Sequence, residues 1–260
     1  MASQVLRVAY SCRCLHSASG SLAVAAQTRS FAWTQDDKVV NFKVKADEVN
    51  VQKLAGGVLL RCEQGLATSL VSMGAASVYN SIRALVLANR YAERRHAEAA
   101  ASGTTSSATP LQVGFVPRFG RSSTNQWIRM QVVPICNVSP DFAAGDEIAL
   151  ASATLRASSQ TDMRRLGAAI LNQWVHHSAG KAPLPVLAAM GRESVSISVK
   201  SAAFALRELA QRRGGARPFL CRPSMMQVPE NHNPKEMQTV TYLSFRFHHE
   251  ATSERNSGGD

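Results

Sequence analysis

Residues 70–91 read Leu70-Val-Ser-Met-Gly-Ala-Ala-Ser-Val-Tyr-Asn-Ser-Ile-Arg-Ala-Leu-Val-Leu-Ala-Asn-Arg-Tyr91, and this stretch decides the fold that we expect for the chain. It begins with a short apolar run that leads into Met-Gly, as a buried strand does before a tight turn. Apolar residues then recur at helical spacing, at Val78, Ile82 and Leu85. The stretch therefore predicts a strand, a glycine turn and an amphipathic helix in direct succession.

The same pattern occurs a second time, at Val186-Leu-Ala-Ala-Met-Gly-Arg-Glu-Ser-Val195, so that Met-Gly-x-x-Ser-Val begins at Met73 and again at Met190. Further elements match in order around both positions, and Pro117 and Pro223 stand at matching strand ends. In the first copy these elements are at 42–46, 54–60, 111–117 and 127–133, and in the second they are at 154–157, 166–171, 218–223 and 240–247. We therefore expect an α+β chain with the order β-α-β-α-β-β in each of two domains, residues 38–136 and 150–249.

The composition of the remaining segments differs from that of the two copies. Residues 1–35 contain three Arg and no acidic residue, and they are rich in Ser and Ala. This composition predicts a mitochondrial targeting segment, with a plastid segment or an ordinary disordered tail as the alternatives. Residues 137–149 predict a turn-rich acidic linker, 97–110 a mobile loop and 250–260 a disordered tail.

Four stretches of the first copy carry a resemblance to a known family. They are Leu54-Ala-Gly-Gly, Met73-Gly-Ala-Ala-Ser-Val, Ile82-Arg-Ala-Leu-Val-Leu-Ala-Asn-Arg-Tyr91 and Val116-Pro-Arg-Phe119. Together they resemble the bacterial stage V sporulation protein S family, a relative of the Alba nucleic-acid-binding domains. The resemblance covers about 42–135 and, more weakly, about 152–248, where Arg192-Glu193 replaces small residues. It implies Alba-like domains, each a four-stranded sheet backed by two helices, that form a pseudo-dimer within one chain.

No constellation of residues in the sequence predicts catalysis. The turn at 73–77 could hold a phosphate at a helix N-terminus, but it lacks the Lys-Ser/Thr of a P-loop, so tight packing is the preferred interpretation. His176-His177 and His248-His249 have no further ligand at metal-binding spacing, and Ser77 and Ser194 have no His and acid at repeated positions. We therefore expect no catalytic residue, metal or cofactor and no enzymatic activity. An enzyme that uses the glycine turn for a phosphorylated small molecule remains the alternative.

The charge favours a polyanionic partner. The net charge is +11, so nucleic acid is the first candidate and an anionic membrane surface the second, and no apolar run is long enough to predict a membrane span. Without residues 1–35 the charge would be only about +8, which is moderate for a nucleic-acid-binding protein. Phe115 and Phe119 could stack on a base, although core packing is the preferred interpretation for both.

Alignment of the two copies brings several cations into register. It pairs Lys45 with Arg156, Lys53 with Arg165, Arg83 with Lys200, and Arg90 with Arg207. This coincidence has two interpretations, namely two solvated helix faces or one positive face that contacts phosphates without reading the base sequence. The candidate nucleic-acid contacts are Lys45, Lys53, Arg83, Arg90, Arg94, Arg156, Arg165, Lys200, Arg207 and Arg212.

These observations lead to one expected function and one close alternative. We expect an RNA-binding structural component of a large ribonucleoprotein in the mitochondrial matrix, such as the mitochondrial ribosome or an RNA-processing complex. Its partners would be RNA and other proteins of that assembly. The alternative is a DNA-binding protein of the organelle nucleoid, because Alba-like domains bind both nucleic acids.

Overall fold

The computed structural model describes residues 9–11, 30–32, 39–47, 49–103, 111–121, 126–135, 155–212, 218–229 and 237–247. Within the expected targeting segment, β1 (Ala9–Ser11) and β2 (Ser30–Ala32) pair as a separate antiparallel sheet. The rest of that segment, the predicted linker 137–149 and the predicted tail 250–260 lie outside the described residues.

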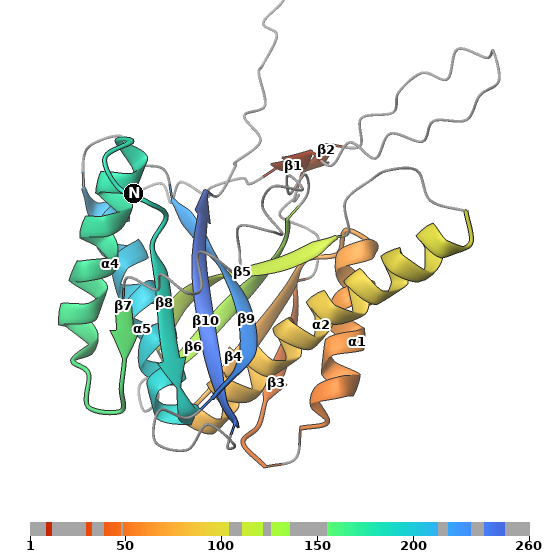
Figure 1. Ribbon diagram of the computed structural model, residues 1–260, viewed down its shortest axis with the longest axis horizontal. Helices are drawn as coiled ribbons and strands as arrows, with labels where there is room; N and C mark the ends of the chain where they lie inside the picture. Colours follow the sequence, from red (N-terminus) through yellow and green to blue (C-terminus); the bar gives the residue numbers. More distant parts are fainter. Residues whose placement is uncertain are drawn as a thin grey trace, which may run out of the picture.

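Two units with the same order of elements make up the body of the molecule (Figure 1). The first contains β3 (Val40–Val44), α1 (Val51–Glu63), β4 (Thr68–Ser72), α2 (Ala75–Ala101), β5 (Gln112–Arg121) and β6 (Gln126–Ile135). The second contains β7 (Leu155–Ala157), α4 (Met163–Ser178), β8 (Val186–Met190), α5 (Gly191–Gln211), β9 (Phe219–Pro229) and β10 (Met237–Phe247). The predicted α+β class and order of elements are thereby confirmed.

All eight strands of the two units form one mixed sheet. Its order is β3-β4-β6-β5-β9-β10-β8-β7, so each unit contributes four adjacent strands in the same internal order. The units meet where β5 runs antiparallel to β9, with Phe115 opposite Cys221. In each unit the first two strands are parallel and the others antiparallel. Pro117 and Pro223 occupy equivalent register positions, as predicted, but they lie inside β5 and β9, so their expected place at strand ends was wrong.

Equivalent local signals start the helices in both units. Gly74 and Gly191 have φ angles of 83° and 82°, a region that side chains rarely adopt, which explains why glycine follows methionine in both copies. The first helix of each unit begins at a side-chain cap, because Asn50 accepts from the backbone N–H of Lys53 at 2.9 Å and Asp162 from that of Arg165 at 2.7 Å.

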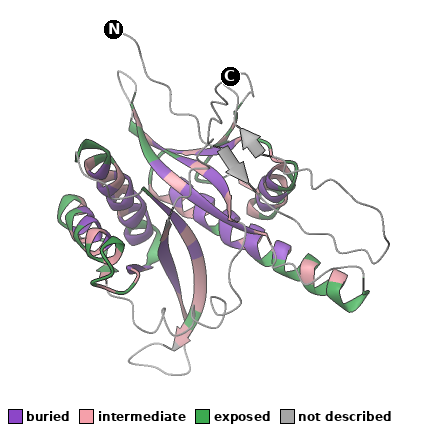
Figure 2. Ribbon diagram, turned by 90° about the horizontal axis from the view of Figure 1, so that it is seen from above, coloured by how far each residue is buried: buried purple, intermediate pink, exposed green. Residues whose placement is uncertain are grey.

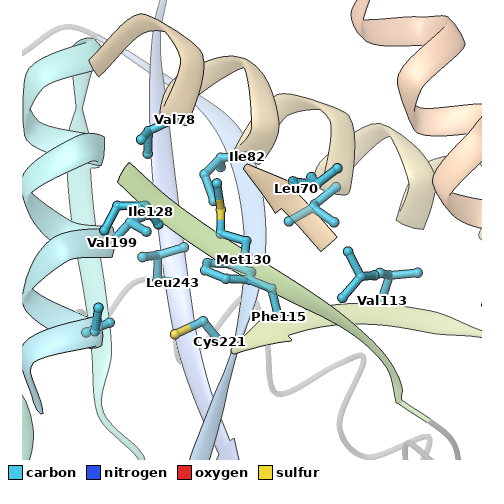
Figure 3. Packing of buried hydrophobic residues seen from close by; sticks show 14 of the residues in the cluster. Leu70, Val78, Ile82, Val113, Phe115, Ile128, Met130, Val199, Cys221 and Leu243 are labelled. Atoms are coloured by element: carbon cyan, nitrogen blue, oxygen red, sulfur yellow. The ribbon is translucent and has the colours of Figure 1, made fainter. Parts of the chain in front are cut away.

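One hydrophobic core serves both units. Phe115, Cys221 and Leu243 from the sheet lie against Ile82 of α2 and Val199 of α5, and all five belong to one contiguous buried cluster (Figure 3). On the helices, buried residues lie on the inner sides and exposed residues on the outer sides, whereas most residues in the middle of the strands are buried or half-buried (Figure 2). Removal of either unit would therefore expose the apolar surface of the other.

The second helix of the first unit is longer than the sequence predicted. It continues to Ala101, so residues 97–101 of the predicted mobile loop are helical, and 104–110 lie outside the described residues. The run Ala97-Glu98-Ala99-Ala100-Ala101 consists of strong helix formers, and Arg94 pairs with Glu98 one turn later at 3.2 Å. Helix propensity thus outweighed the low complexity that suggested a loop.

Candidate nucleic-acid interface

The predicted contact residues are distributed over all four helices and two strand positions. Lys53 lies on α1, Arg83, Arg90 and Arg94 on α2, Arg165 on α4, Lys200 and Arg207 on α5, Arg212 at the end of α5, Arg156 on β7, and Lys45 directly after β3. All are exposed except Lys200, which is half-buried. They therefore do not form a single cluster.

On three of the four described helices, these cations lie among carboxylates. α1, α2 and α5 contain Glu63, Glu93, Glu98, Glu193 and Glu208, whereas α4 contains no acidic residue. Arg94 pairs with Glu98, and Arg207 pairs with Glu208 at 3.3 Å while its guanidinium lies 5.1 Å from the ring centre of Phe204. This mixed charge favours the solvated-face interpretation for the helix layer.

Arg90 has a structural contact between the two units. Its guanidinium donates a hydrogen bond of 3.1 Å to the backbone carbonyl of Met225, which lies on β9 of the second unit. A substitution of Arg90 would therefore disturb the packing of α2 against β9 as well as remove a charge.

The strand register corrects one pair in the sequence alignment. Arg156 stands opposite Ala188, and in the first unit the residue opposite the equivalent Val71 is Lys43. The structural counterpart of Arg156 is therefore Lys43 and not Lys45, a shift of two residues. The expected strand at 42–46 is in fact 40–44, which accounts for the shift.

Within its described strands, the sheet carries positive charge without any acidic residue. None of the eight strands, all of which the structure describes, contains Asp or Glu. The same strands contain Lys43, Arg118, Arg121, Arg129, Arg156, Arg222 and Arg246. No carboxylate within these strands can neutralise the cations.

By strand alternation, all of these cations except Arg121 occupy positions on the face opposite to the one that packs on the helices, although Arg222 also interacts electrostatically with Glu93 of α2. Side chains alternate between the two faces of a strand, and Leu70, Met130 and Phe115 mark the face that packs on the helices. Lys43, Arg129 and Arg118 occupy the alternate positions, as do Arg156, Arg222 and Arg246 of the second unit. We call this side of the sheet the outer face.

Three outer-face cations of the first unit lie in one row across the strands. The register runs from Lys43 through Val71 to Arg129 and Arg118, and all three cations are exposed. Arg118 and Arg129 are direct cross-strand neighbours, an arrangement of like charges that costs about 0.2–1 kcal/mol in a sheet. A bound anion would relieve this repulsion.

Two half-buried arginines carry charge on the outer face of the second unit, at positions equivalent to Val116 and Val133 of the first unit. Arg222 lies opposite Ser244 on β10, and Arg246 lies two residues further along the same strand. Burial lowers the pKa of both guanidinium groups, and Arg222 lowers that of Arg246 further, whereas Glu93 opposes the shift at Arg222. Burial therefore disfavours the charged form of both groups, and the carboxylate of Glu93 partly offsets this effect at Arg222.

Several residues weighed for chemistry have structural roles instead. Phe115 is fully buried in the core, which confirms the preferred interpretation and excludes the stacking alternative for it, whereas Phe119 is 36% exposed. The hydroxyl of Ser77 donates to the carbonyls of Met73 and Gly74 within the turn. Among the described residues, no group of three or more His, Cys, Asp or Glu could hold a metal ion.

Sequence reasoning missed the outer face except for Arg156. The available signal was the complete lack of acidic residues in every predicted strand, beside cations at alternate positions. Alternation alone does not show which face of a strand is covered by helices. The face on which these cations lie could therefore not be predicted without the strand register.

Comparison with protein-family models and with curated proteins gives no match to this chain. Among the described helices, none is both long enough and apolar enough to cross a membrane.

Proposed function

We propose that the protein is an RNA-binding structural component of a large ribonucleoprotein in the mitochondrial matrix, such as the mitochondrial ribosome or an RNA-processing complex. In this proposal its two units are Alba-like domains joined as an internal pseudo-dimer. The observation that carries the proposal is the acid-free sheet, whose outer face bears cations from both units. Such a face attracts a polyphosphate backbone and contributes affinity without sequence specificity.

Sedimentation of the native protein tests the assembly. We expect it to sediment with a large particle from organelle extracts, and we expect RNase treatment before centrifugation to release it or to reduce the particle. Release by DNase instead would support the nucleoid alternative. A protein that remains small under all conditions would contradict the proposal.

Salt-dependent RNA binding tests which surface contacts RNA. In the full chain, the triple variant Lys43→Gln, Arg118→Gln, Arg129→Gln should bind more weakly, and each lost contact should reduce the slope of log affinity against log salt by about 0.7 for single strands. The matched variant Arg83→Ala, Lys200→Ala, Arg207→Ala removes three helix cations and should change the slope little. If the helix variant reduces the slope and the sheet variant does not, the RNA contacts lie on the helix layer and not on the outer face.

A further inference from the structure

An indole ring lies flat against the backbone at one end of the outer face. Trp127 on β6 is directly opposite Gly120 on β5, and a Cβ atom added at Gly120 would overlap the indole of Trp127. The glycine thus lets the ring pack directly on the strand, while Trp127 stays partly exposed. This contact fixes the ring before any ligand arrives.

The two exposed arginines of the cation row form the cross-strand pair next to this ring, both on the same side of it. Arg129 follows Trp127 by two residues on β6, and Arg118 precedes Gly120 by two residues on β5, so both lie on the same face as the indole. Alternate residues of a strand are about 7 Å apart, a distance that long side chains readily span. The ring and both guanidinium groups can therefore contact one ligand.

The second unit has no such arrangement. The counterparts of Arg129, Arg118, Trp127 and Gly120 are Tyr242, Ser224, Val240 and Met226. Of these, Tyr242 and Val240 are buried together with Val186 in a small apolar cluster. Among its described residues, the chain therefore has one such arrangement of Trp127, Arg118 and Arg129, which we call the platform.

We propose that this platform binds single-stranded RNA, with an unpaired base stacked on the indole of Trp127 and the adjoining phosphates on Arg118 and Arg129. The inference rests on the proposed function for the class of partner and adds that the RNA is unpaired at the point of contact. An aromatic ring accepts any base on its face, and nearby cations hold the backbone, which together give affinity without strong sequence preference. Paired bases are stacked on one another and cannot reach a flat protein surface.

Fluorescence of Trp127 tests the stacking directly. In the full chain carrying Trp33→Phe, Trp127 is the partly exposed indole and Trp174 is fully buried. A single-stranded RNA oligonucleotide should quench the fluorescence of Trp127, and a hairpin-free duplex of the same sequence should not. Equal quenching by both would overturn the inference.

Substitutions at the platform test its contribution to affinity. Trp127→Leu should weaken binding of the single strand roughly tenfold or more, whereas Trp127→Phe keeps an aromatic face and should retain most of the affinity. Gly120→Ala, which displaces the indole, should resemble Trp127→Leu. Arg164→Ala on α4 removes one exposed charge away from the outer face and serves as the control, with thermal unfolding measured for every variant.

The outcomes separate this inference from the proposed function. The wild-type chain could bind RNA while the Trp127→Leu and Gly120→Ala variants bind it as tightly as the wild type. In that case the inference about the platform is wrong and the proposed function stands. If the wild-type chain binds no RNA, both fail. Equal quenching by single-stranded DNA would support the stacking, because the base and not the sugar makes that contact.

Discussion

The two units share a topology but differ on their outer faces. Across the sheet, the first unit presents Lys43, Val71, Arg129 and Arg118, and the second presents Arg156, Ala188, Tyr242 and Ser224 at the equivalent positions. On the side facing the helices, Leu70, Met130 and Phe115 of the first unit correspond to Leu187, Leu243 and Cys221 of the second, and all six are buried apolar residues. The comparison teaches that two units with the same strand order and register can keep the face that packs on the helices apolar and still carry different chemistry on the outer face.

A second difference lies at the junction of the units. Asn89 of α2 is buried, its amide donates to the carbonyl of Val113 at 3.1 Å, and its oxygen accepts from the N–H of Val113 at 2.6 Å. The equivalent residue of α5 is Leu206, an apolar residue that packs against the core. The first unit therefore uses a polar side chain to satisfy the backbone of β5 beside the junction, and the second does not.

The largest effect that we expect concerns the core that both units share. Phe115→Ala in the first unit and Phe219→Ala in the second each remove a fully buried ring, and each should lower the free energy of unfolding by about 3–5 kcal/mol. Because the core is continuous, calorimetry should show one transition that both substitutions shift. Two transitions, of which each variant shifts only its own, would mean that the units unfold independently.

Asn89→Ala tests the polar contact at the junction. It leaves a buried N–H and a buried carbonyl of Val113 without their side-chain partner, so we expect a loss of about 2–3 kcal/mol in urea unfolding. Leu206→Ala at the equivalent place should cost less, because Leu206 is only partly buried. An equal loss in the two variants would remove the asymmetry inferred here.

The two glycine turns should respond alike. Gly74→Ala and Gly191→Ala place a Cβ on a backbone with positive φ, which should cost about 1–3 kcal/mol each. No atom lies within 4 Å of either Cβ position, so strain and not crowding is the cause. Gly57→Ala inside α1 has equal space and no positive φ, and it should be neutral or slightly stabilising.

Transfer of residues from the second unit to the first should convert one outer face into the other. The pair Arg118→Ser and Arg129→Tyr should reduce the salt slope of binding to single-stranded RNA by about 1.4. Thermal stability should remain the same or rise slightly, because the like-charge pair disappears. A large drop in the melting temperature would show that the arginines have a structural role that their exposure does not indicate.

The smallest effect concerns two thiols, one in each unit. Burial raises the pKa of Cys62 to about 12, with Glu63 adding to the shift, and burial alone raises that of Cys221. Both should react with a thiol reagent at pH 8 only as fast as the protein opens. Because the folded pKa values exceed the usual 9.0, stability should decline slightly as the pH rises above about 9. Fast reaction of Cys221 alone would show that the second unit opens locally.

The sequence was sufficient to predict the order of the elements because each depends on local signals. The repeated Met-Gly turn, the apolar spacing after it and the matched Pro117 and Pro223 are all visible without the fold. The shared core was not predictable, since it depends on the pairing of β5 with β9, whose residues are about 100 positions apart. The outer-face cations also depend on the register, and a shift of two residues at Lys45 was enough to misplace one of them.

The edge-to-edge junction also limits how many units can assemble. The inner edges of β5 and β9 are joined to each other, and the free ends of the sheet are the short strands β3 and β7, of five and three residues. Short outer strands offer little template for a further strand. The sheet therefore cannot be extended by a third unit through the same β5–β9 type of pairing. The number of units in the sheet is set by the two copies within one chain. A gene fragment for one unit alone would present the unused edge of β5, and its natural partner would be a second copy of itself.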